Sequence, residues 1–455
     1  MIALDALGQN GSYRTRNRLT VTDVAGGPLA ELSLVPPLFV TRAMSALRKA
    51  TPMPVQARVK AIAEAGELFA GGEVNGMTAA EYRHTVSRMS GMPLPVVRAA
   101  AEGVAQRAAS AYDHDLQAAR PTGAANDWRD PRTWRGAAVW IRRGEVFAVL
   151  AAGNHPGVHA GWLEPLAAGY RVAVRPSRRE PLTPHRLVSA LRACGFGDDQ
   201  VALLPTDHGV ADEILRAADL GMVYGGQEVI DKYANDPTIL PNGPGRSKIL
   251  ITADSDWRDH VDLIVDSVSA QGGTACVNTT AVFVEGDPGP VAAAVAERLA
   301  AIPSLPPDNE KAVLSAYPLE TAKVFESYLL AKAAGVRAHL GGDGVVDELD
   351  GGGAVLRPAV FELADPFAPQ AGVELAFPCV WVAPWTRDAG VVPLRDSLVL
   401  TAVTEDEDLI DALQTEPTIR NLYIGDHPTH WMAPGVPHDG YLGEFLMRSK
   451  GVIRA

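Results

Sequence analysis

The stretch that sets the fold class runs from residue 145 to residue 177 and reads EVFAVLAAGNHPGVHAGWLEPLAAGYRVAVRPS. Two short apolar segments, 146–150 and 171–174, flank a helical segment at about 157–169. Parallel strands need a long crossover connection, which is usually a helix. The stretch therefore predicts a strand, a crossover helix and a second strand of one parallel sheet.

The same alternation continues along the chain. Further apolar strands are expected at 201–204, 220–224 and 248–251, with helices between them at about 184–195, 209–217 and 227–235. Short buried strands joined by helices indicate a doubly wound α/β domain. A second alternation begins after Ala253 and continues to about residue 424, so we expect a second α/β domain.

The remaining segments are less regular. We expect a hairpin at 18–35, three or four helices from 37 to about 118, a polar loop and protruding strand at 119–142, and a Gly- and Pro-rich tail from 431. Alternating apolar residues predict the hairpin, and a helical period predicts the helices. These segments are expected to complete the two domains or to extend beyond them.

Composition excludes several classes of protein. The 455 residues are 47% hydrophobic and 21% charged, which is enough to bury two cores. A net charge of −13 argues against a general nucleic-acid or anionic-membrane binder. Three widely spaced cysteines make neither a disulfide framework nor a zinc site, so we expect no metal. No apolar run reaches the roughly 18 residues of a membrane helix, and we expect a cytoplasmic protein.

One cysteine has the surroundings of a nucleophile. Cys276 lies in the segment SAQGGTACVN, residues 269–278, among small and polar neighbours and just before an apolar strand at 280–285. A thiol that attacks a bulky substrate needs an approach free of large side chains, so Cys276 is the candidate nucleophile. Cys194 and Cys379 lie in apolar patterns and are expected to pack in the core.

Ligands in a doubly wound sheet bind at the carboxyl ends of its strands. The segments that follow the strands of the first domain are 152–155, 175–178, 205–207 and 225–228. The first of these turns lacks Gly-x-Gly-x-x-Gly, so the standard dinucleotide fingerprint is absent.

The order of these segments nevertheless resembles that of the aldehyde dehydrogenase superfamily, from about Arg18 to the C-terminus. Residues 153–155, Gly-Asn-His, resemble the family's Pro-Trp-Asn-Phe turn, and residues 175–178, Arg-Pro-Ser-Arg, resemble Lys-Pro-Ser-Glu. Residues 225–228, Gly-Gly-Gln-Glu, resemble Gly-Ser-Thr-Glu. The nucleophile segment resembles Asn-Gln-Gly-Gln-x-Cys, and residues 374–378 resemble Glu-x-Phe-Gly-Pro.

The resemblance implies roles for these residues. Cys276 would be the catalytic nucleophile, and the amide of Asn154 would help to stabilise the oxyanion. The implied contacts of a nicotinamide cofactor are Arg175, Ser177, Arg178, Gly225, Gly226, Glu228 and Glu374. The residues expected to line the substrate site are His155, Asn242 and Gly243.

The resemblance also implies a division of the chain. A Rossmann-like cofactor domain would comprise residues 1–121 and 145–252, and a catalytic domain residues 253–430. A hairpin at 122–144 and the tail at 431–455 would form a small β element for oligomerisation, in a homodimer or homotetramer.

One departure from the family pattern changes the expected product. Where hydrolytic members carry Glu-Leu-Gly-Gly-Lys, this chain has Asn242 followed by Gly-Pro-Gly-Arg. An asparagine cannot accept a proton from water near neutral pH, so the usual general base is missing. A thioacyl enzyme that resists water can exchange with another thiol. The chain thus resembles CoA-acylating aldehyde dehydrogenases and acyl-CoA reductases, which implies NADPH-dependent reduction of an acyl-CoA or carrier-protein thioester to an aldehyde, reversible in principle.

Two alternatives to this function stay open. One is NAD(P)-dependent oxidation of an aldehyde to an acid with a non-standard base. The other is a catalytically silent scaffold that keeps the fold. NADP(H) is preferred to NAD(H), because Arg178 and Arg179 replace the family's acidic ribose ligand and would attract a 2′-phosphate, unless one arginine points into solvent.

Simpler structural roles also remain for several of these residues. His155 and His159 can pack or line the substrate site, Glu228 can cap its helix, and Glu374 can be a surface carboxylate. The tryptophans at 128, 134 and 140 are expected to pack in an interface or in the hairpin.

Overall fold

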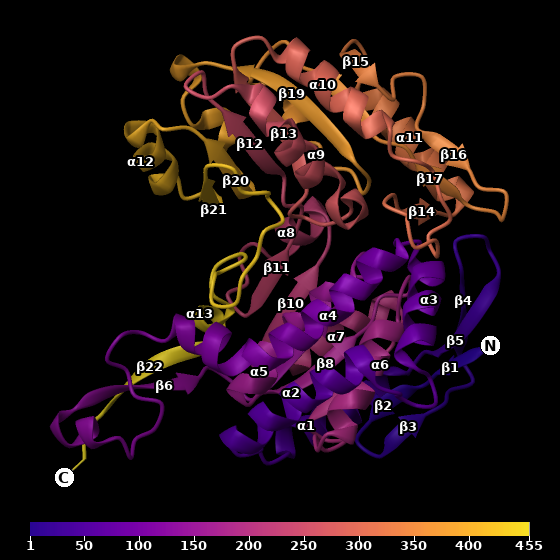
Figure 1. Ribbon diagram of the computed structural model, residues 1–455. Coiled ribbons are helices and arrows are strands. Elements are labelled where there is room, and N and C mark those ends of the chain that lie inside the picture. The colour runs from indigo at the N-terminus through magenta and orange to yellow at the C-terminus, as the bar shows by residue number, and fades with distance from the viewer. Residues whose placement is uncertain (455) are drawn as a thin grey trace.

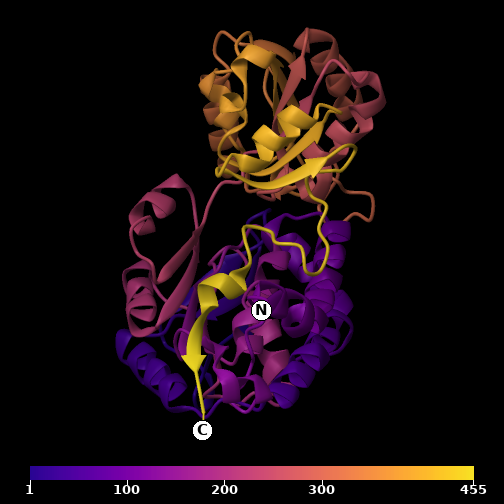
Figure 2. The same ribbon diagram turned by 90° about the vertical axis from the view of Figure 1, so that its left-hand side faces the viewer.

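The computed structural model describes residues 1–454. Figure 1 shows two lobes, one built from the first half of the chain and one from residues after about 247, with a narrow ribbon projecting from the first lobe. The turned view in Figure 2 shows the C-terminal segment running from the upper lobe down along the lower one. The fold class expected from the sequence is confirmed, since each lobe is a helix-covered α/β sheet.

The first lobe contains a seven-stranded sheet of order β11-β10-β7-β8-β9-β2-β3. Its strands are β2 (Ala6–Gly8), β3 (Gly11–Tyr13), β7 (Val146–Leu150), β8 (Arg171–Arg175), β9 (Val201–Leu203), β10 (Leu220–Tyr224) and β11 (Ile239–Asn242). The five strands from β11 to β9 are parallel, and Leu150 at the end of β7 lies opposite Arg175 at the end of β8. The loops that follow β7, β8 and β10 therefore meet at one edge.

Different helices cover the two faces of this sheet. The helices of the lobe are α1 (Pro37–Lys49), α2 (Val55–Gly71), α3 (Ala79–Ser90), α4 (Leu94–Ser110), α5 (Leu163–Ala168), α6 (Leu182–Ala193), α7 (His208–Ala217) and α8 (Gln227–Tyr233). Phe147 and Val149 of β7 pack with α2, α4 and α6, whereas Val146 and Ala148 pack with α1 and α7. The alternation of side chains along a strand thus buries both faces.

The second lobe contains another seven-stranded sheet, of order β15-β18-β19-β13-β12-β20-β21. Its strands are β12 (Ser247–Ile251), β13 (Thr279–Glu285), β15 (Arg337–Leu340), β18 (Ala359–Glu362), β19 (Cys379–Trp385), β20 (Ser397–Val403) and β21 (Ile419–Ile424). Residues of α9 (Val261–Ser269) and α10 (Pro288–Ala300) pack on one face, and those of α11 (Leu319–Lys332) and α12 (Glu407–Thr415) pack on the other.

The division between the lobes differs from the expected boundary at residue 252. We expected the strand at 248–251 to end the first domain, but β12 lies between β13 and β20 in the second sheet. The chain therefore crosses between the sheets at 243–246, immediately after β11. An apolar strand carries no signal for which of two parallel sheets it joins, whereas the Gly-Pro-Gly linker before it marks the crossing.

Smaller sheets complete the molecule. The expected hairpin at 18–35 is present as β4 (Arg18–Thr22) and β5 (Pro28–Ser33), and β1 (Ile2–Leu4) joins β5 in parallel. In the upper lobe, β14 (Ala316–Tyr317), β16 (Val346–Glu348) and β17 (Ala354–Leu356) form an antiparallel sheet. Among the described residues, no helix is both long and apolar enough to span a bilayer.

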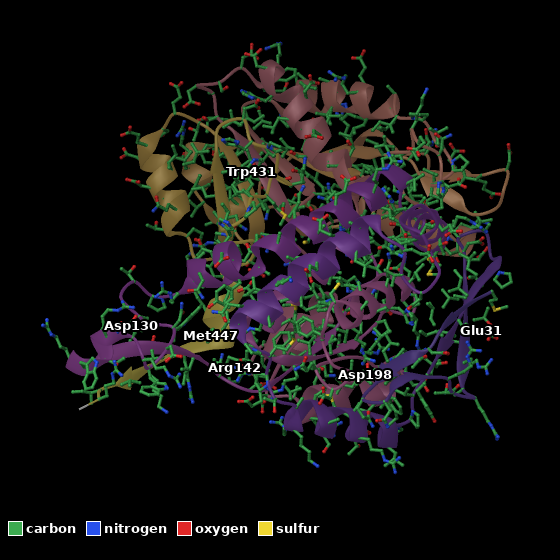
Figure 3. All side chains as sticks on the ribbon, turned by 60° about the horizontal axis from the view of Figure 1, so that its bottom comes forward. Glu31, Asp130, Arg142, Asp198, Trp431 and Met447 are labelled. Carbon is green, nitrogen blue, oxygen red and sulfur yellow. The ribbon has the colours of Figure 1, made fainter. Side chains whose placement is uncertain are left out.

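The projecting two-stranded sheet of residues 137–142 and 447–452, called the ribbon below, differs from the expected hairpin at 122–144. That region holds a short 3-10 helix, η3 (Pro131–Arg135), and one strand, β6 (Ala137–Arg142). The antiparallel partner of β6 is β22 (Met447–Val452), which follows the short helix α13 (Leu442–Leu446). Met447 pairs with Arg142, and the two side chains lie close together in Figure 3, with Asp130 further out along the ribbon.

Candidate active site

The loop that carries Cys276 joins α9 to β13 and has an unusual backbone. Gln271, Gly272 and Gly273 follow one another at positive φ, with values of 53°, 71° and 68°. At Gly273 a Cβ atom would lie 2.3 Å from the backbone nitrogen of Pro378, so only glycine fits there. The small residues of the motif are thus needed for the path of the chain as well as for access to the thiol.

Asn278 fixes the shape of this loop from inside. Its side-chain oxygen accepts a hydrogen bond from the backbone N–H of Ala275 at 2.9 Å. Its amide nitrogen donates to the carbonyl oxygens of Ala270 at 2.8 Å and Ser267 at 3.1 Å. The sequence interpretation gave this residue no role. The only signal in the sequence was an asparagine two positions after the cysteine, next to an apolar strand.

Asn154 joins the first lobe to the Cys276 loop. It lies in the turn after β7, which ends at Leu150, and its Nδ2 atom donates to the carbonyl oxygen of Thr274 at 3.2 Å. Thr274 lies two residues before Cys276. The structure therefore places Asn154 of the first lobe against the loop of the second lobe that carries Cys276, while the oxyanion role that the resemblance implies for Asn154 stays a prediction.

The two histidines after Asn154 are held by local contacts. The Nδ1 atom of His155 accepts from the backbone N–H of Gly157 at 3.0 Å, and burial lowers the pKa of His155 to about 4. His159 accepts at Nδ1 from the indole N–H of Trp162 at 3.1 Å, and burial lowers its pKa to about 3. Both imidazoles are therefore neutral near neutral pH. The Nε2 atom of His159 is buried and has no hydrogen-bond partner among residues 1–454.

The thiol of Cys276 is half-buried and faces a histidine that the sequence interpretation did not find. Its Sγ atom lies 3.9 Å from Nε2 of His438. Burial raises the pKa of the Cys276 thiol to about 12, and the nearby carboxylate of Glu374 acts in the same direction. Without a proton acceptor the thiol would stay protonated near neutral pH.

The segment that crosses between the lobes lies against the cysteine. A Cβ atom at Gly245 would come within 1.8 Å of the carbonyl oxygen of Cys276, and the hydroxyl of Ser247 donates to the same oxygen at 3.0 Å. Asn242 turns back onto its own sheet, where its amide lies 3.5 Å from the carbonyl oxygens of Val223 and Leu240.

Gly243 packs against α8 in the same segment, because a Cβ atom there would lie 2.6 Å from the side chain of Ile230. A role for Asn242 and Gly243 in lining the substrate site stays a prediction.

Glu374 is half-buried beside the same segment. Its Oε2 atom accepts from the backbone N–H of Arg246 at 2.7 Å, and burial raises the pKa of its carboxyl group. It is not the surface carboxylate considered from the sequence.

A lysine that the sequence interpretation also missed supports this region. Lys248 donates to the carbonyl oxygens of Arg246 and Arg395 and to the hydroxyl of Ser397, and burial lowers its pKa to about 7.

The turn after β10 is close-packed against α8. A Cβ atom at Gly225 would lie 2.2 Å from the side chain of Val229, and one at Gly226 would lie 2.5 Å from the carboxylate of Glu228. Glu228 itself lies in the first turn of α8, which favours a negative charge. A side chain at position 225 would clash with Val229, whereas the flexible carboxylate of Glu228 can move away from one at position 226, and both glycines leave backbone open at the carboxyl edge of the sheet.

The segment after β8 does not form the expected pair of arginines. Arg178 makes an ion pair with Asp207 at 2.6 Å. Arg179 turns away, donates to the carbonyl oxygen of Ser90 at 2.7 Å and lies over the ring of Tyr317 at 5.1 Å. The expectation of two guanidinium groups facing one phosphate is thus wrong, because Arg179 is used to connect the lobes.

The other two residues expected here are close by. The guanidinium group of Arg175 is buried against Thr206, at 3.3 Å from its carbonyl oxygen, and burial lowers its pKa. The hydroxyl of Ser177 accepts from the backbone N–H of Arg179 at 3.2 Å. Their proposed cofactor contacts stay predictions.

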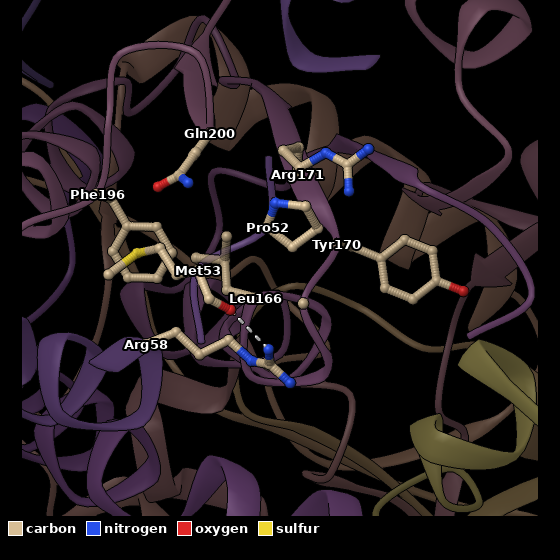
Figure 4. A pocket seen from close by; sticks show the side chains of 9 residues that line it. Pro52, Met53, Arg58, Leu166, Tyr170, Arg171, Phe196 and Gln200 are labelled. Atoms are coloured by element: carbon tan, nitrogen blue, oxygen red, sulfur yellow. Dashed lines mark hydrogen bonds between the residues drawn. The ribbon is translucent and has the colours of Figure 1, made fainter. Parts of the chain in front are cut away.

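Two cavities lie away from Cys276. One, shown in Figure 4, has a volume of about 10 Å³ and is bordered by Arg58, Tyr170 and Arg171 near the amino end of β8, opposite the edge that carries the site. It has room for at most one water molecule. The other, of about 400 Å³, lies beside β2 and α6 and is bordered by Asp5 and His185.

The remaining cysteines are distant from this chemistry. Cys379 is 6% exposed within the core of the second lobe, and Cys194 packs at the edge of the core of the first.

Comparison with known proteins decides the family. The family described as "Aldehyde dehydrogenase family" matches residues 39–401 of the chain. The chain belongs to the aldehyde dehydrogenase family. This membership confirms the resemblance drawn from the sequence.

Two sequence relatives have names that give their substrates. The chain is 26% identical over 279 residues to 2-hydroxymuconic semialdehyde dehydrogenase of Pseudomonas sp. (strain CF600), which covers 56% of the chain and 55% of that protein. It is 25% identical over 151 residues to malonate-semialdehyde dehydrogenase 2 of Bacillus mycoides (strain KBAB4), which covers 31% of each. The chain thus spans about half, or less, of the length of these relatives. Their names give no support to the CoA-acylating subtype.

Solved aldehyde dehydrogenases have the same fold over nearly the whole chain. An indole-3-acetaldehyde dehydrogenase in complex with NAD+ superimposes with a TM-score of 0.84 at 17% identity, covering 100% of this chain and 97% of the other. The 1-pyrroline-5-carboxylate dehydrogenase of Thermus thermophilus superimposes with a TM-score of 0.83 at 16% identity, covering 99% and 92%. At 16–17% identity, these superpositions show that this chain has the same fold as the two enzymes.

Proposed function

We propose that this member of the aldehyde dehydrogenase family oxidises an aldehyde with NAD(P)+ through a thioacyl group on Cys276. The observation that carries the proposal is the contact between Asn154 and the Cys276 loop, 3.2 Å from Nδ2 to the carbonyl oxygen of Thr274. This contact supports the proposal because it holds the Asn154 amide against the loop that carries the thiol. The semialdehyde dehydrogenases among the relatives favour the same direction of reaction.

The chain's own groups support an attack by the thiol on a carbonyl carbon. The Sγ atom of Cys276 forms the bond to carbon, and the negative charge that develops on the carbonyl oxygen needs donors. An amide nitrogen carries two hydrogen atoms, so Asn154 can donate one to Thr274 and the other to the oxyanion. The backbone N–H of Cys276 is the second expected donor.

The residues at the carboxyl edge of the first sheet fit a dinucleotide. Gly153 lies so close to Ser177 that a Cβ atom would meet its hydroxyl at 2.4 Å, and Gly225 and Gly226 likewise leave only backbone at the edge. Close approach of backbone to phosphate is the role of such glycines. A bound nicotinamide would supply the oxidant, and Ser177, Arg178 and Glu374 are the proposed side-chain contacts.

Any preference for NADP+ over NAD+ depends on one arginine and not on the two that were expected. With Arg179 used between the lobes, Arg178 alone remains to bind a 2′-phosphate, and it would have to leave Asp207. We therefore propose that NAD+ and NADP+ are both accepted, with any NADP+ preference due to Arg178.

The presence of Asn242, where hydrolytic members of the family carry a glutamate, supports a second candidate function. Its amide faces the carbonyl oxygens of Val223 and Leu240 and supplies no proton acceptor for water. A thioacyl enzyme could then be released by the thiol of coenzyme A or of a carrier protein, and the reverse reaction would reduce an acyl thioester to an aldehyde with NADPH.

One set of assays tests both functions. The purified protein is mixed with NAD+ or NADP+ and a panel of aldehydes and semialdehydes, with and without coenzyme A, and the absorbance of the reduced nicotinamide is followed. We expect reduction without coenzyme A and none with the Cys276→Ser variant. A strict requirement for coenzyme A would favour the thioester function, and no reduction under any condition would indicate the silent scaffold.

A further inference from the structure

His438 lies in the C-terminal tail, outside both large sheets, and its Nε2 atom is 3.9 Å from the Sγ atom of Cys276. We propose that His438 is the proton acceptor of Cys276 and takes the place of the carboxylate that is missing at Asn242. The role in turnover rests on the proposed function, whereas the effect on the thiol can be measured without it.

The position of His438 is set by the catalytic lobe. The side-chain amide of Asn421, a buried residue of β21, donates to the carbonyl oxygen of His438 and to that of Leu398, the latter at 2.8 Å. The tail is thereby attached to the same sheet that contains β13, which begins three residues after Cys276. One rigid sheet thus orients both members of the pair.

A second set of contacts holds the tail from the other side. The backbone N–H of Gly435 donates to Asp115 at 3.3 Å, and the hydroxyl of Tyr441 donates to the carbonyl oxygen of Gly435 at 2.9 Å. Asp115 is a buried residue of the first lobe. The loop that carries His438 is therefore tied to both lobes.

The charges around His438 leave it able to accept a proton. Burial lowers the pKa of His438, the nearby Arg107 acts in the same direction, and Asp439 acts against them. Neutral imidazole is consequently the form present near neutral pH, and one of its ring nitrogens is free to accept. Cys276, protonated because burial raises its pKa, is the adjacent donor.

Glu374 is a weaker candidate for the same role. Its carboxylate already accepts a hydrogen bond from the backbone N–H of Arg246 at 2.7 Å. Its charge also raises the pKa of the thiol of Cys276, which opposes formation of the thiolate.

The proton movements balance over the reaction. As the C–S bond forms, the proton of Cys276 moves to Nε2 of His438 and the carbonyl electron pair moves to oxygen. Bound NAD(P)+ would be the oxidant that takes the hydride from this carbon, and His438 then releases its proton to solvent. Water then adds to the thioacyl carbon and gives a proton to His438, the C–S bond breaks, and the departing sulfur takes that proton. An acid and a restored thiol result.

The test begins with the protein free of cofactor and substrate. The rate at which iodoacetamide alkylates Cys276 is measured for the wild type, His438→Gln and a control, His427→Gln, with peptide mass spectrometry to identify the modified cysteine. His427 is exposed and lies between β21 and the tail that carries His438. Since general-base assistance contributes about 10²–10⁴-fold, we expect alkylation to slow at least tenfold in His438→Gln and to be unchanged in the control.

Equal alkylation rates in the wild type and a folded His438→Gln variant would overturn the proposal. If His438→Gln does not fold, as judged by its thermal unfolding, the same comparison is made with His438→Asn. His438→Glu, which keeps a proton acceptor, should recover part of the rate.

Turnover assays separate this proposal from the proposed function. If no aldehyde is oxidised but alkylation still depends on His438, the base assignment stands and the function is wrong. If aldehydes are oxidised equally well by His438→Gln, the function stands and the base assignment is wrong. Loss of both alkylation and turnover in His438→Gln alone supports the two together.

Discussion

Asn154 connects the first lobe to the loop of the second lobe that carries Cys276. Its side chain spans from the end of β7 to Thr274 in the Cys276 loop. The amide carries two hydrogen atoms, so one can fix the loop through Thr274 and the other can serve the reaction. The two effects can be separated, because only the second grows as charge develops on the substrate oxygen.

We predict that Asn154→Ala lowers kcat for aldehyde oxidation about 10²–10³-fold, equivalent to about 2.7–4 kcal/mol, the usual cost of one missing oxyanion donor. Affinity for NAD+, measured by fluorescence titration, should be nearly unchanged, since Asn154 contacts the Cys276 loop and not the proposed cofactor edge. A variant that keeps the wild-type kcat would remove Asn154 from the reaction.

At the scale of elements, the Cys276 loop depends on glycine more strictly than an exposed turn does. Gly273 combines a φ of 68° with a backbone neighbour, Pro378, against which a Cβ atom would lie at 2.3 Å. Backbone cannot move aside as a side chain can, so a methyl group must displace the loop from the segment before β19.

We predict that Gly273→Ala lowers the free energy of unfolding by about 1–3 kcal/mol, the typical cost of overpacking, and moves the thiol enough to impair its alkylation. Gly335→Ala is the matched control, because Gly335 has a similar φ of 79° with no atom within 4 Å of the added methyl group. Urea denaturation of both variants gives the comparison. If the two lose equal stability, the clash with Pro378 is unimportant.

The elements also show what the sequence could predict. Apolar runs flanked by glycine gave β7, β8 and β10 within a residue of their observed bounds, because strands of a doubly wound sheet are buried on both faces. The sheet that β12 joins was not predictable, since its burial pattern suits either one. Asn154 and Cys276 were found because each lies beside a strand, Asn154 after β7 and Cys276 before β13, in a recognisable motif.

His438 shows why part of the site was missed. It is 162 residues from Cys276, in a segment of glycine, proline and polar residues that has no periodicity. Its position depends on tertiary contacts with Asn421 and Asp115, which a local pattern does not encode. The same holds for Arg179, whose partners Ser90 and Tyr317 lie in distant parts of the chain.

At the scale of the whole molecule, the ribbon of β6 and β22 lies outside the two large sheets and adds to neither of them. It has two strands and projects from the first lobe (Figure 1). In the part of the chain that the structure describes, the outer edge of β22 pairs with no further strand, whereas the other edge, on β6, forms a single bridge between Val139 and Ala125. Two-stranded sheets are marginal alone, and free edges favour pairing with another chain.

Exposed apolar side chains on and around the ribbon also favour pairing with another chain. Trp128 and Trp134 are 49% and 54% exposed, and the guanidinium group of Arg454 lies 4.1 Å from the ring centre of Trp134. These exposed tryptophans agree with the interface role considered for them, whereas Trp140 of β6 is buried. A second copy of the chain, paired edge to edge, would cover both the backbone and the rings. We therefore propose a homodimer or homotetramer assembled through the ribbon.

We predict that truncation after Leu446, which removes β22, converts the oligomer to a monomer whose two lobes remain folded. Without β22, β6 has no partner strand and the ribbon cannot present an edge. The mass in solution, measured by light scattering after size exclusion, decides the outcome, and Val324→Ser serves as the control, because Val324 is 68% exposed on α11 in the upper lobe, far from the ribbon. An unchanged mass after truncation would place the interface elsewhere, and a monomeric wild type would contradict the assembly itself.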